Sequence, residues 1–494
     1  MTLLAQIGGV VGAAGLALVA AGTGYRPRVV GLALLAAGAG AVALYLAPSV
    51  SAPLLAAAAV AGLIGAAALA WAFLRWPWLL AFAVLACIPV RIPVNLGDSD
   101  ANLLVPLYGV TAAAGLALLW QVVRGGDRRS RELGPVALPL AAFVLWTGIS
   151  ILWTDDLQEG AIALGAFILP FGLLSVCIAR LPWRGRWLTW LWGALVGTAL
   201  VYAAIGVYQW STREVFWNPK VKVGNAYAPF FRVNSVFWDP SIYGRYLVVG
   251  ILTALAGVLL RGVSGKQVWG LIVLIAAMWV GLFFSFSQTS FVALAVGVTA
   301  AAVVVWGRRA LLAGLALGLV IAVGTLALPQ VRHRILDHKR YNKVTSGRAS
   351  LVGQGARIAL AHPVFGVGVG DFKSAYAARV GLHGRQTKLG ASHTTPITVA
   401  AETGFVGLAA FIWLLLAAFS ATLRRLGRGF TSRVSFAVGL TLLAIAVHSV
   451  FYNAFFEDPM TWALLGLTGL AASVPRRPGE PSEPSEPSEP GGET

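Results

Sequence analysis

A histidine and a glutamate lie nine residues apart in the segment GASHTTPITVAAETGFVGL, and both could take part in proton transfer. His393 stands just before Thr395 and Pro396, which together indicate the start of an apolar helix. An imidazole at such a helix end can accept a proton at neutral pH. Glu402 follows Pro396 by six residues, roughly 9 Å further along the same helix. An ionisable group that deep in an apolar helix is costly and is usually paired or functional.

Three helix starts share one pattern that suits an anion. Asp239-Pro240, Thr395-Pro396 and Asp458-Pro459 each place a capping residue before a proline at the first helical position. Helix N-termini attract negative charge, and the segments 209–239 and 329–395 next to them are rich in arginine and lysine. The combination favours an anion-binding cavity. A solvated loop that happens to be basic is the alternative interpretation.

Arg245 lies in the second turn of the helix that begins at Pro240, roughly 8 Å from its start. Its charge is opposite to that of Glu402, and its depth is similar. A structural ion pair between Arg245 and Glu402 is therefore an alternative to a direct catalytic role for either residue.

The composition shows what kind of molecule must position these residues. Of 494 residues, 58% are hydrophobic and only 11% are charged, whereas soluble domains carry about 25% charged residues. The apolar excess must face lipid, or other helices within lipid. Cys87 and Cys177 both lie in apolar runs, so neither a disulfide framework nor a cysteine metal site is expected. The net charge of +18 indicates basic cytoplasmic loops and anionic lipid rather than nucleic acid.

The hydropathy pattern predicts an all-α polytopic integral membrane protein with about 14–15 transmembrane helices, each about 20 residues long. A long extracytoplasmic loop is expected before the third-last helix. The predicted spans are approximately 3–22, 29–47, 51–74, 78–94, 103–123, 135–153, 161–178, 187–208, 240–260, 268–284, 289–305, 311–328, 396–418, 434–451 and 460–472.

Short basic connections predict the orientation of these helices. If the helices alternate, the arginines and lysines near positions 26, 128, 184, 264, 308 and 428 all fall on one side, which is the cytoplasmic side. The N-terminus and the long segments 209–239 and 329–395 are then extracytoplasmic, and the C-terminus is cytoplasmic. The Pro-Ser-Glu repeat in 475–494 is expected to be a disordered cytoplasmic tail.

Three segments resemble the O-antigen ligase and polymerase family, in the family's order and between helices. The first, FRVNSVFWDPSIYGRYL, resembles a family segment with an arginine, a phenylalanine and a proline. The second, SGRASLVGQGARIALAHPVFGVGVGDF, resembles a glycine-rich stretch, and the third is the segment that contains His393. The matching residues are Arg232, Phe237, Pro240, Ser346, Gly347, Arg348, His362, Pro363, Gly366, Gly368, Gly370, Phe372, His393, Glu402 and Gly404.

The chain departs from the family pattern at several positions. Gln288 follows Ser287 where the family often has an arginine, and glutamine can bind a phosphate by hydrogen bonds but brings no charge. Thr394 stands where an asparagine often follows the histidine, and Ser235 replaces the usual glycine.

The resemblance implies a membrane glycosyltransferase of GT-C-like architecture in the cytoplasmic (inner) membrane. Residues 76–474 would form the ligase-like domain, and 1–75 would be additional N-terminal helices. The enzyme would move a glycan from an undecaprenyl-pyrophosphate carrier to an acceptor hydroxyl of a glycan, lipid or protein at the outer face, without metal or cofactor. His393 and Glu402 would be catalytic, and the residues expected to bind the pyrophosphate are Arg232, Arg348, Arg245 and Gln288.

Two other functions remain open. A polymerase of the same family would use another lipid-linked repeat unit as the acceptor. A transporter without catalysis should instead show inverted repeats and polar residues in broken helices at mid-membrane. The sequence shows no such repeat, and its polar residues cluster toward the outer edge.

Overall fold

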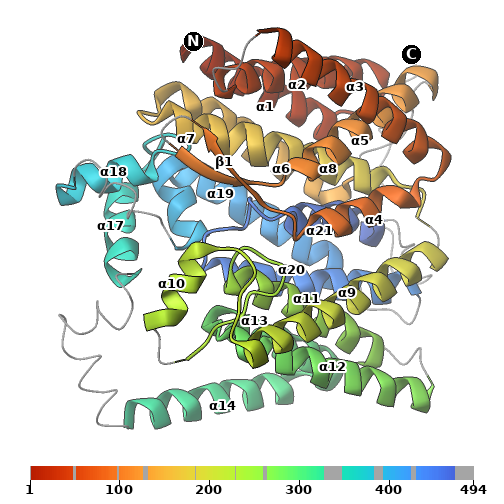
Figure 1. The fold of residues 1–494 in the computed structure, drawn as a ribbon, viewed down its shortest axis with the longest axis vertical. Helices are drawn as coiled ribbons and strands as arrows, with labels where there is room; N and C mark the ends of the chain where they lie inside the picture. The colour runs from red at the N-terminus through yellow and green to blue at the C-terminus, as the bar shows by residue number, and fades with distance from the viewer. Residues whose placement is uncertain are drawn as a thin grey trace, which may run out of the picture.

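The computed structural model describes residues 2–47, 52–96, 99–125, 132–183, 185–227, 230–259, 264–327, 348–382, 393–423 and 430–472. This part of the chain is almost entirely helical (Figure 1). Eleven of its helical segments are long and apolar enough to cross a membrane. The protein is therefore an all-α polytopic membrane protein, as the hydropathy pattern predicts.

Every predicted span overlaps a helix of the structure. The first half of the chain contains α1 Thr2–Ala21, α2 Tyr25–Leu46, α3 Ala52–Arg75, α4 Trp78–Cys87, α5 Val105–Gly125, α6 Ala137–Ile149, α7 Leu157–Ile162, α8 Leu169–Arg180, α9 Gly185–Thr212 and α10 Pro219–Tyr227. The second half contains α11 Pro240–Leu259, α12 Gly265–Ser285, α13 Gln288–Trp306, α14 Arg308–Ala327, α17 Arg348–Ala361, α18 Phe372–Val380, α19 Thr395–Leu423, α20 Phe430–Ser449 and α21 Pro459–Ala472.

The predicted span 78–94 is helical only in its first half. Helix α4 ends at Cys87, and the chain continues as an antiparallel hairpin of β1 Ile92–Leu96 and β2 Ser99–Leu103. Pro89 and Pro93 explain the break, because a proline lacks the N–H that a helix needs and disfavours helical backbone in the residue before it. The expectation of one continuous helix here is wrong. As a result, Arg91 lies in the connection between a short helix and the hairpin.

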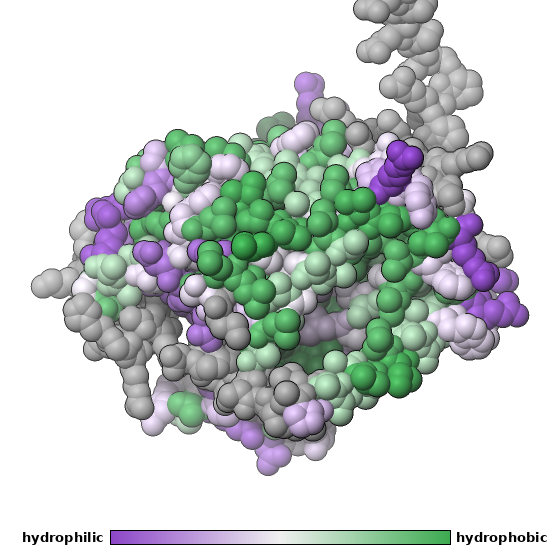
Figure 2. Space-filling model, turned by 90° about the horizontal axis from the view of Figure 1, so that it is seen from above, coloured by the Kyte–Doolittle hydropathy of each residue, from purple (hydrophilic) through white to green (hydrophobic). Residues whose placement is uncertain are grey.

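The long helices run side by side, and their ends form two faces. Helices α10, α17 and α18 lie at one end, on the left of Figure 1, and we call this end the loop face. In Figure 2 a band of hydrophobic residues crosses the molecule between more hydrophilic residues at both ends. Such a band is the surface that a bilayer requires of a spanning protein.

Ion pairs at the end opposite the loop face join three connections between helices. The charge pattern predicts that all three lie on the same side of the membrane. Arg28 at the start of α2 contacts both oxygens of Glu132, at 2.7 and 2.5 Å. Arg180 at the end of α8 contacts the same carboxylate at 3.1 Å. The three connections therefore meet at one place, as the predicted alternation requires, and the side of the membrane on which they lie stays a prediction.

The N-terminal helices are packed into the body of the protein. Helix α1 contacts α2, α6 and α8, and its Leu16 and Val19 belong to the main hydrophobic core. A Cβ on Gly15 would lie 2.3 Å from the backbone nitrogen of Leu35 in α2. Glycine thus allows the backbones of α1 and α2 to approach closely, as small residues do between membrane helices.

Candidate functional site

The glycine-rich segment 362–372 packs against α19, backbone to backbone. Helix α19 is interrupted at Gly404, where φ is 68° and ψ is −173°. The N–H of Val367 donates to the carbonyl of Ala401 at 2.9 Å, and the N–H of Gly368 donates to the carbonyl of Glu402 at 2.8 Å. Two of the family-like segments therefore form one structural unit, in which the loop binds carbonyls next to the bend of the helix.

Glycines make this close packing possible. A Cβ on Gly404 would lie 2.1 Å from the carbonyl oxygen of Val364, and one on Gly366 would lie 2.4 Å from that of Glu402. Both residues also have positive φ values, which only glycine adopts at low cost. The glycines of the family-like pattern thus serve the architecture that presents the site.

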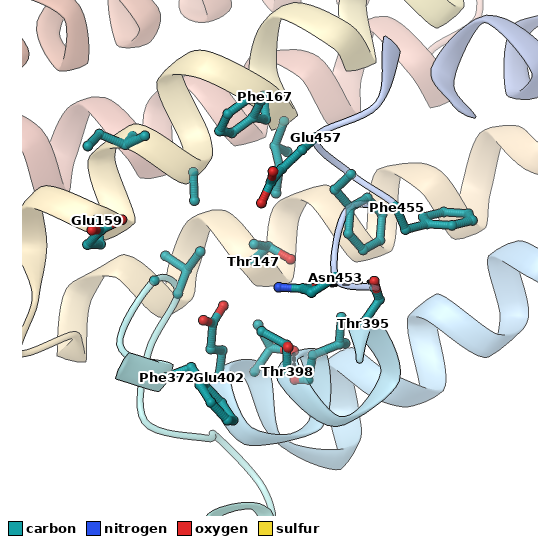
Figure 3. A pocket seen from close by; sticks show the side chains of 18 of the residues that line it. Thr147, Glu159, Phe167, Phe372, Thr395, Thr398, Glu402, Asn453, Phe455 and Glu457 are labelled. Atoms are coloured by element: carbon teal, nitrogen blue, oxygen red, sulfur yellow. Dashed lines mark hydrogen bonds between the residues drawn. The ribbon is translucent and has the colours of Figure 1, made fainter. Parts of the chain in front are cut away.

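A cavity of about 340 Å³ lies beside this unit (Figure 3). It is bounded by α6, α7, the segment after α7, α18, α19 and the segment 453–457. The side chains of Glu402 and Glu457 enter it from opposite sides. At its edge, Lys373 forms an ion pair with Glu159 at 3.0 Å. The Glu402 carboxyl group lies next to the backbone amides at positions 370 and 372, so it also fixes the glycine-rich segment.

Arg232, Arg348 and His393, near the start of α19, form a second polar group, which we call the arginine group. The side chain of Arg232 is anchored because its Nε donates to the carbonyl of Ser285 at 3.2 Å. Its backbone exchanges two hydrogen bonds with the side chain of Asn225 in α10, at 2.9 and 3.0 Å. Burial lowers the pKa of Arg232, Asp239 opposes this effect, and Arg348 adds to it. The two guanidinium groups are therefore close enough to repel each other.

His393 belongs to this second group. Burial lowers the pKa of its imidazole, Arg348 lowers it further, and Asp239 raises it. The net direction favours the neutral imidazole, which is the form that accepts a proton. Arg348 thus interacts electrostatically with both Arg232 and His393, and a shared role of the three in binding a pyrophosphate stays a prediction. Glu402 lies roughly 10 Å along α19 from Thr395, the first residue of the helix and two residues after His393.

Arg245 does not pair with Glu402, so this predicted ion pair is wrong. Its Nη2 lies 2.8 Å from Oδ2 of Asp458, and the two side chains are 2% and 7% exposed. Helix α11, which carries Arg245, packs against α20. The segment that leaves α20 brings Asp458 to Arg245, whereas Glu402 faces the cavity on the other side of that segment. Arg245 and Glu402 lie at similar depths in their helices, but their side chains do not point toward each other.

Two of the three predicted helix caps are confirmed. Asp239 accepts a hydrogen bond from the N–H of Ser241 at 2.7 Å, and Asp458 accepts one from the N–H of Met460 at 3.0 Å. Thr395 differs, because it is the first residue of α19 and its hydroxyl donates to Oδ1 of Asn453 at 3.0 Å. This contact joins the start of α19 to the segment that follows α20.

Gln288 is the exposed first residue of α13. Behind it, hydroxyl groups form a buried chain in which Ser287 Oγ lies 2.8 Å from Ser290 Oγ and 3.1 Å from Thr289 Oγ1. Thr289 Oγ1 in turn lies 3.0 Å from Nε2 of His448. The buried chain thus ends at the imidazole of His448 in α20. Contact between Gln288 and a phosphate stays a prediction.

The sequence did not single out three residues that interact with groups at the cavity or at the arginine group, namely Arg91, Tyr452 and Glu457. Nη2 of Arg91 donates to the carbonyl of Glu457 at 3.1 Å. Burial raises the pKa of the Glu457 carboxyl group, while Arg91 lowers it. Tyr452 interacts electrostatically with both Asp239 and Glu457. The available signal was an arginine between two prolines inside a predicted span, in IPVRIPV.

One region of the chain, which contains part of this site, matches a known protein family. Residues 271–412 match the family model described as O-antigen ligase. The matched region contains Gln288, Arg348, His393 and Glu402, whereas Arg232 precedes it. No curated protein sequence matches the chain. The match supports a general function in glycan transfer at a membrane, and residues 271–412 are similar to the O-antigen ligase family.

Proposed function

We propose that the protein transfers a glycan from an undecaprenyl-pyrophosphate carrier to an acceptor hydroxyl at the outer face of the cytoplasmic membrane. The observation that carries this proposal is the grouping of Arg232, Arg348 and His393. A pyrophosphate leaving group requires positive charge, and a hydroxyl nucleophile requires a base. Both are present in one place, within or next to the region that matches the family.

In the proposed reaction, the acceptor oxygen attacks the anomeric carbon of the donor sugar. The bond between that carbon and the pyrophosphate oxygen breaks, and its electron pair leaves with the pyrophosphate. Arg232 and Arg348 stabilise the developing negative charge. His393 accepts the proton of the acceptor hydroxyl. We propose that no metal is needed, because the two arginines supply the positive charge.

The other candidate residues take different parts in this proposal. Arg245 already forms an ion pair with Asp458. We therefore assign it a structural role, in which it joins α11 to the start of α21, and its charge adds positive potential near the site. Gln288 would donate hydrogen bonds to a phosphate oxygen from the N-terminus of α13. Glu402 is too far along α19 to share a reacting atom with His393. We therefore assign Glu402 to the architecture of the glycine-rich segment rather than to proton transfer.

The affinity for undecaprenyl pyrophosphate, measured by thermophoresis of the purified protein in detergent, tests the proposal. Arg232→Ala and Arg348→Ala should each weaken binding, because a charge-assisted hydrogen bond contributes about 1.5–3 kcal/mol, or roughly 10- to 150-fold in Kd. Lysine at either position should restore only part of the affinity, since it cannot make a bidentate contact.

Arg26→Ala is the control, because Arg26 is exposed at the start of α2, next to the Arg28 that marks the end opposite the loop face. Its loss should leave donor affinity unchanged. Equal affinity in all of these variants would contradict the proposal. A polymerase and a ligase share this donor site, so incubation of the labelled donor with each class of acceptor would distinguish them by the size of the product.

A further inference from the structure

The cavity beside α19 differs in chemistry from the arginine group. Among its described lining residues, Lys373 carries the one positive charge, and Glu159 already neutralises it at 3.0 Å. Glu402 and Glu457 both point inward (Figure 3). Such a lining offers a pyrophosphate no free positive charge, so this cavity is not a second binding site for the donor headgroup. Carboxyl oxygens instead suit ligands that donate hydrogen bonds, such as hydroxyl groups.

Glu457 has a carboxyl group that the protein does not use. In the part of the chain that the structure describes, Arg91 binds the main-chain carbonyl of Glu457, and no hydrogen bond or ion pair engages its carboxyl oxygens. The side chain is directed into the cavity (Figure 3). By exposure Glu457 is only partly buried, and a carboxyl group that faces a cavity binds a ligand or water there. The group is therefore available to a molecule inside the cavity.

Asn453 is oriented by the protein toward the same space. Its Oδ1 accepts the hydrogen bond of the Thr395 hydroxyl at 3.0 Å. This contact leaves the amide nitrogen facing the cavity, as Figure 3 shows. A donor from Asn453 and acceptors from Glu457 and Glu402 thus converge on one volume. The remaining walls are mostly apolar and include the rings of Phe143, Phe167, Phe372, Phe455 and Phe456.

We infer that this cavity is the acceptor subsite and that it holds a neutral sugar ring of the acceptor. Hydroxyls of the ring would bind Glu457 and Asn453, and its apolar face would pack against the phenylalanines. The volume of 340 Å³ is at the lower end of ligand pockets, about 300–1,000 Å³, and suits a small ring rather than a polymer. Thr395 lines the cavity two residues from His393, so a bound ring would lie beside the base. This inference rests on the proposed function, because the acceptor role presumes the transfer reaction.

Saturation-transfer NMR on the full-length purified protein tests the inference, with glucose, galactose and N-acetylglucosamine as probes. At least one of them should receive saturation from the protein. Glu457→Ala and Asn453→Ala should weaken that binding about fivefold, the effect of losing one hydrogen bond of about 1 kcal/mol. Glu457→Gln should retain part of the binding, because its amide oxygen still accepts a hydrogen bond. Glu214→Ala is the matched control, since Glu214 is exposed in the connection between α9 and α10.

The outcomes separate this inference from the proposed function. Arg348→Ala should keep the saccharide signal, and inorganic pyrophosphate should not compete with it. If the wild-type protein does not bind undecaprenyl pyrophosphate but still gives a saccharide signal, only the proposed function is contradicted. No saturation of any probe, or competition by pyrophosphate, would overturn the acceptor subsite. If Glu457→Ala does not fold, Glu457→Gln and Asn453→Ala decide the question, with thermal melts to verify that each variant is folded.

Discussion

Ser235 shows how single residues hold the arginine group in place. Its φ of 52° lies in the left-handed region, which costs a non-glycine residue about 1–2 kcal/mol. The side chain of Gln209 offsets this cost, because it accepts from the N–H of Ser235 at 2.7 Å and donates to its carbonyl at 2.9 Å. The Ser235 hydroxyl also donates to the carbonyl of Tyr202 at 2.8 Å. A serine can thus replace the usual glycine of the family, three residues after Arg232.

The charges around His393 predict opposite shifts in the pH dependence of transfer. Arg348 lowers the pKa of the imidazole and Asp239 raises it. The turnover rate should fall at low pH as His393 becomes protonated. Arg348→Gln removes a cation, so the pKa should rise and the fall should begin at a higher pH. Asp239→Asn removes an anion but keeps a capping side chain, so the fall should move to a lower pH.

The measurement is the turnover rate against pH at saturating donor. His393→Ala should lose 10²- to 10⁴-fold in rate, as expected for general base catalysis, while binding of undecaprenyl pyrophosphate stays close to wild type. Full activity in His393→Ala would remove it as the base. Shifts of the same sign in the two charge variants would contradict the arrangement of charges.

At the scale of the elements, the bend in α19 and the glycine-rich segment form one unit. The bond from Gly368 to the carbonyl of Glu402 ties the loop to the helix, and the N–H of Phe405 donates to the carbonyl of Pro363 at 2.7 Å. The spacing of glycines in a sequence can indicate such contacts, but it cannot identify the partner backbone. Here the partner is the helix that also positions His393, so the loop fixes the site indirectly.

Replacing Gly404 by alanine should destabilise this unit. The left-handed backbone at Gly404 costs a residue with a Cβ about 1–3 kcal/mol, and the new Cβ would lie 2.1 Å from the Val364 carbonyl. Thermal melts in detergent should show a clear fall in Tm. Gly353→Ala in α17 is the control, because that Cβ meets nothing within 4 Å, and it should be neutral or slightly stabilising. A wild-type Tm in Gly404→Ala would show that the backbone contacts do not matter.

The ion pair between α11 and the start of α21 predicts a specific pattern of coupling. Asp458→Asn leaves Arg245 buried without a counter-charge, which costs about 3–5 kcal/mol, and asparagine still caps α21. Adding Arg245→Met should recover part of that loss. Glu402→Gln combined with Arg245→Met should show no such recovery. Thermal melts of these variants measure both couplings, and recovery only with Glu402→Gln would contradict the pairing in the structure.

At the scale of the whole molecule, the fold class could be predicted because lipid exposure selects apolar runs that are local in sequence. Two of the three caps could be predicted for the same reason, since a cap is a short-range feature. The partner of Arg245 could not, because depth along a helix does not define the direction in which a side chain points. The direction of the Glu457 side chain could not be predicted either, because the segment that carries it is held by residues far away in the sequence, namely Arg91, Arg245 and Thr395.

The orientation of the molecule in the membrane gives the last prediction. The proposed function requires the loop face to be extracytoplasmic, because the lipid-linked donor is used at the outer leaflet. Tyr227 in α10 is 88% exposed at this face, and Arg309 at the start of α14 is exposed in a connection that the charge pattern places on the cytoplasmic side. In a background with both native cysteines replaced by alanine, Tyr227→Cys should react with an impermeant maleimide in intact cells. Arg309→Cys should react only after the membrane is permeabilised. Labelling of Arg309→Cys alone in intact cells would reverse the orientation, and it would place the arginine group on the side where the donor is not presented.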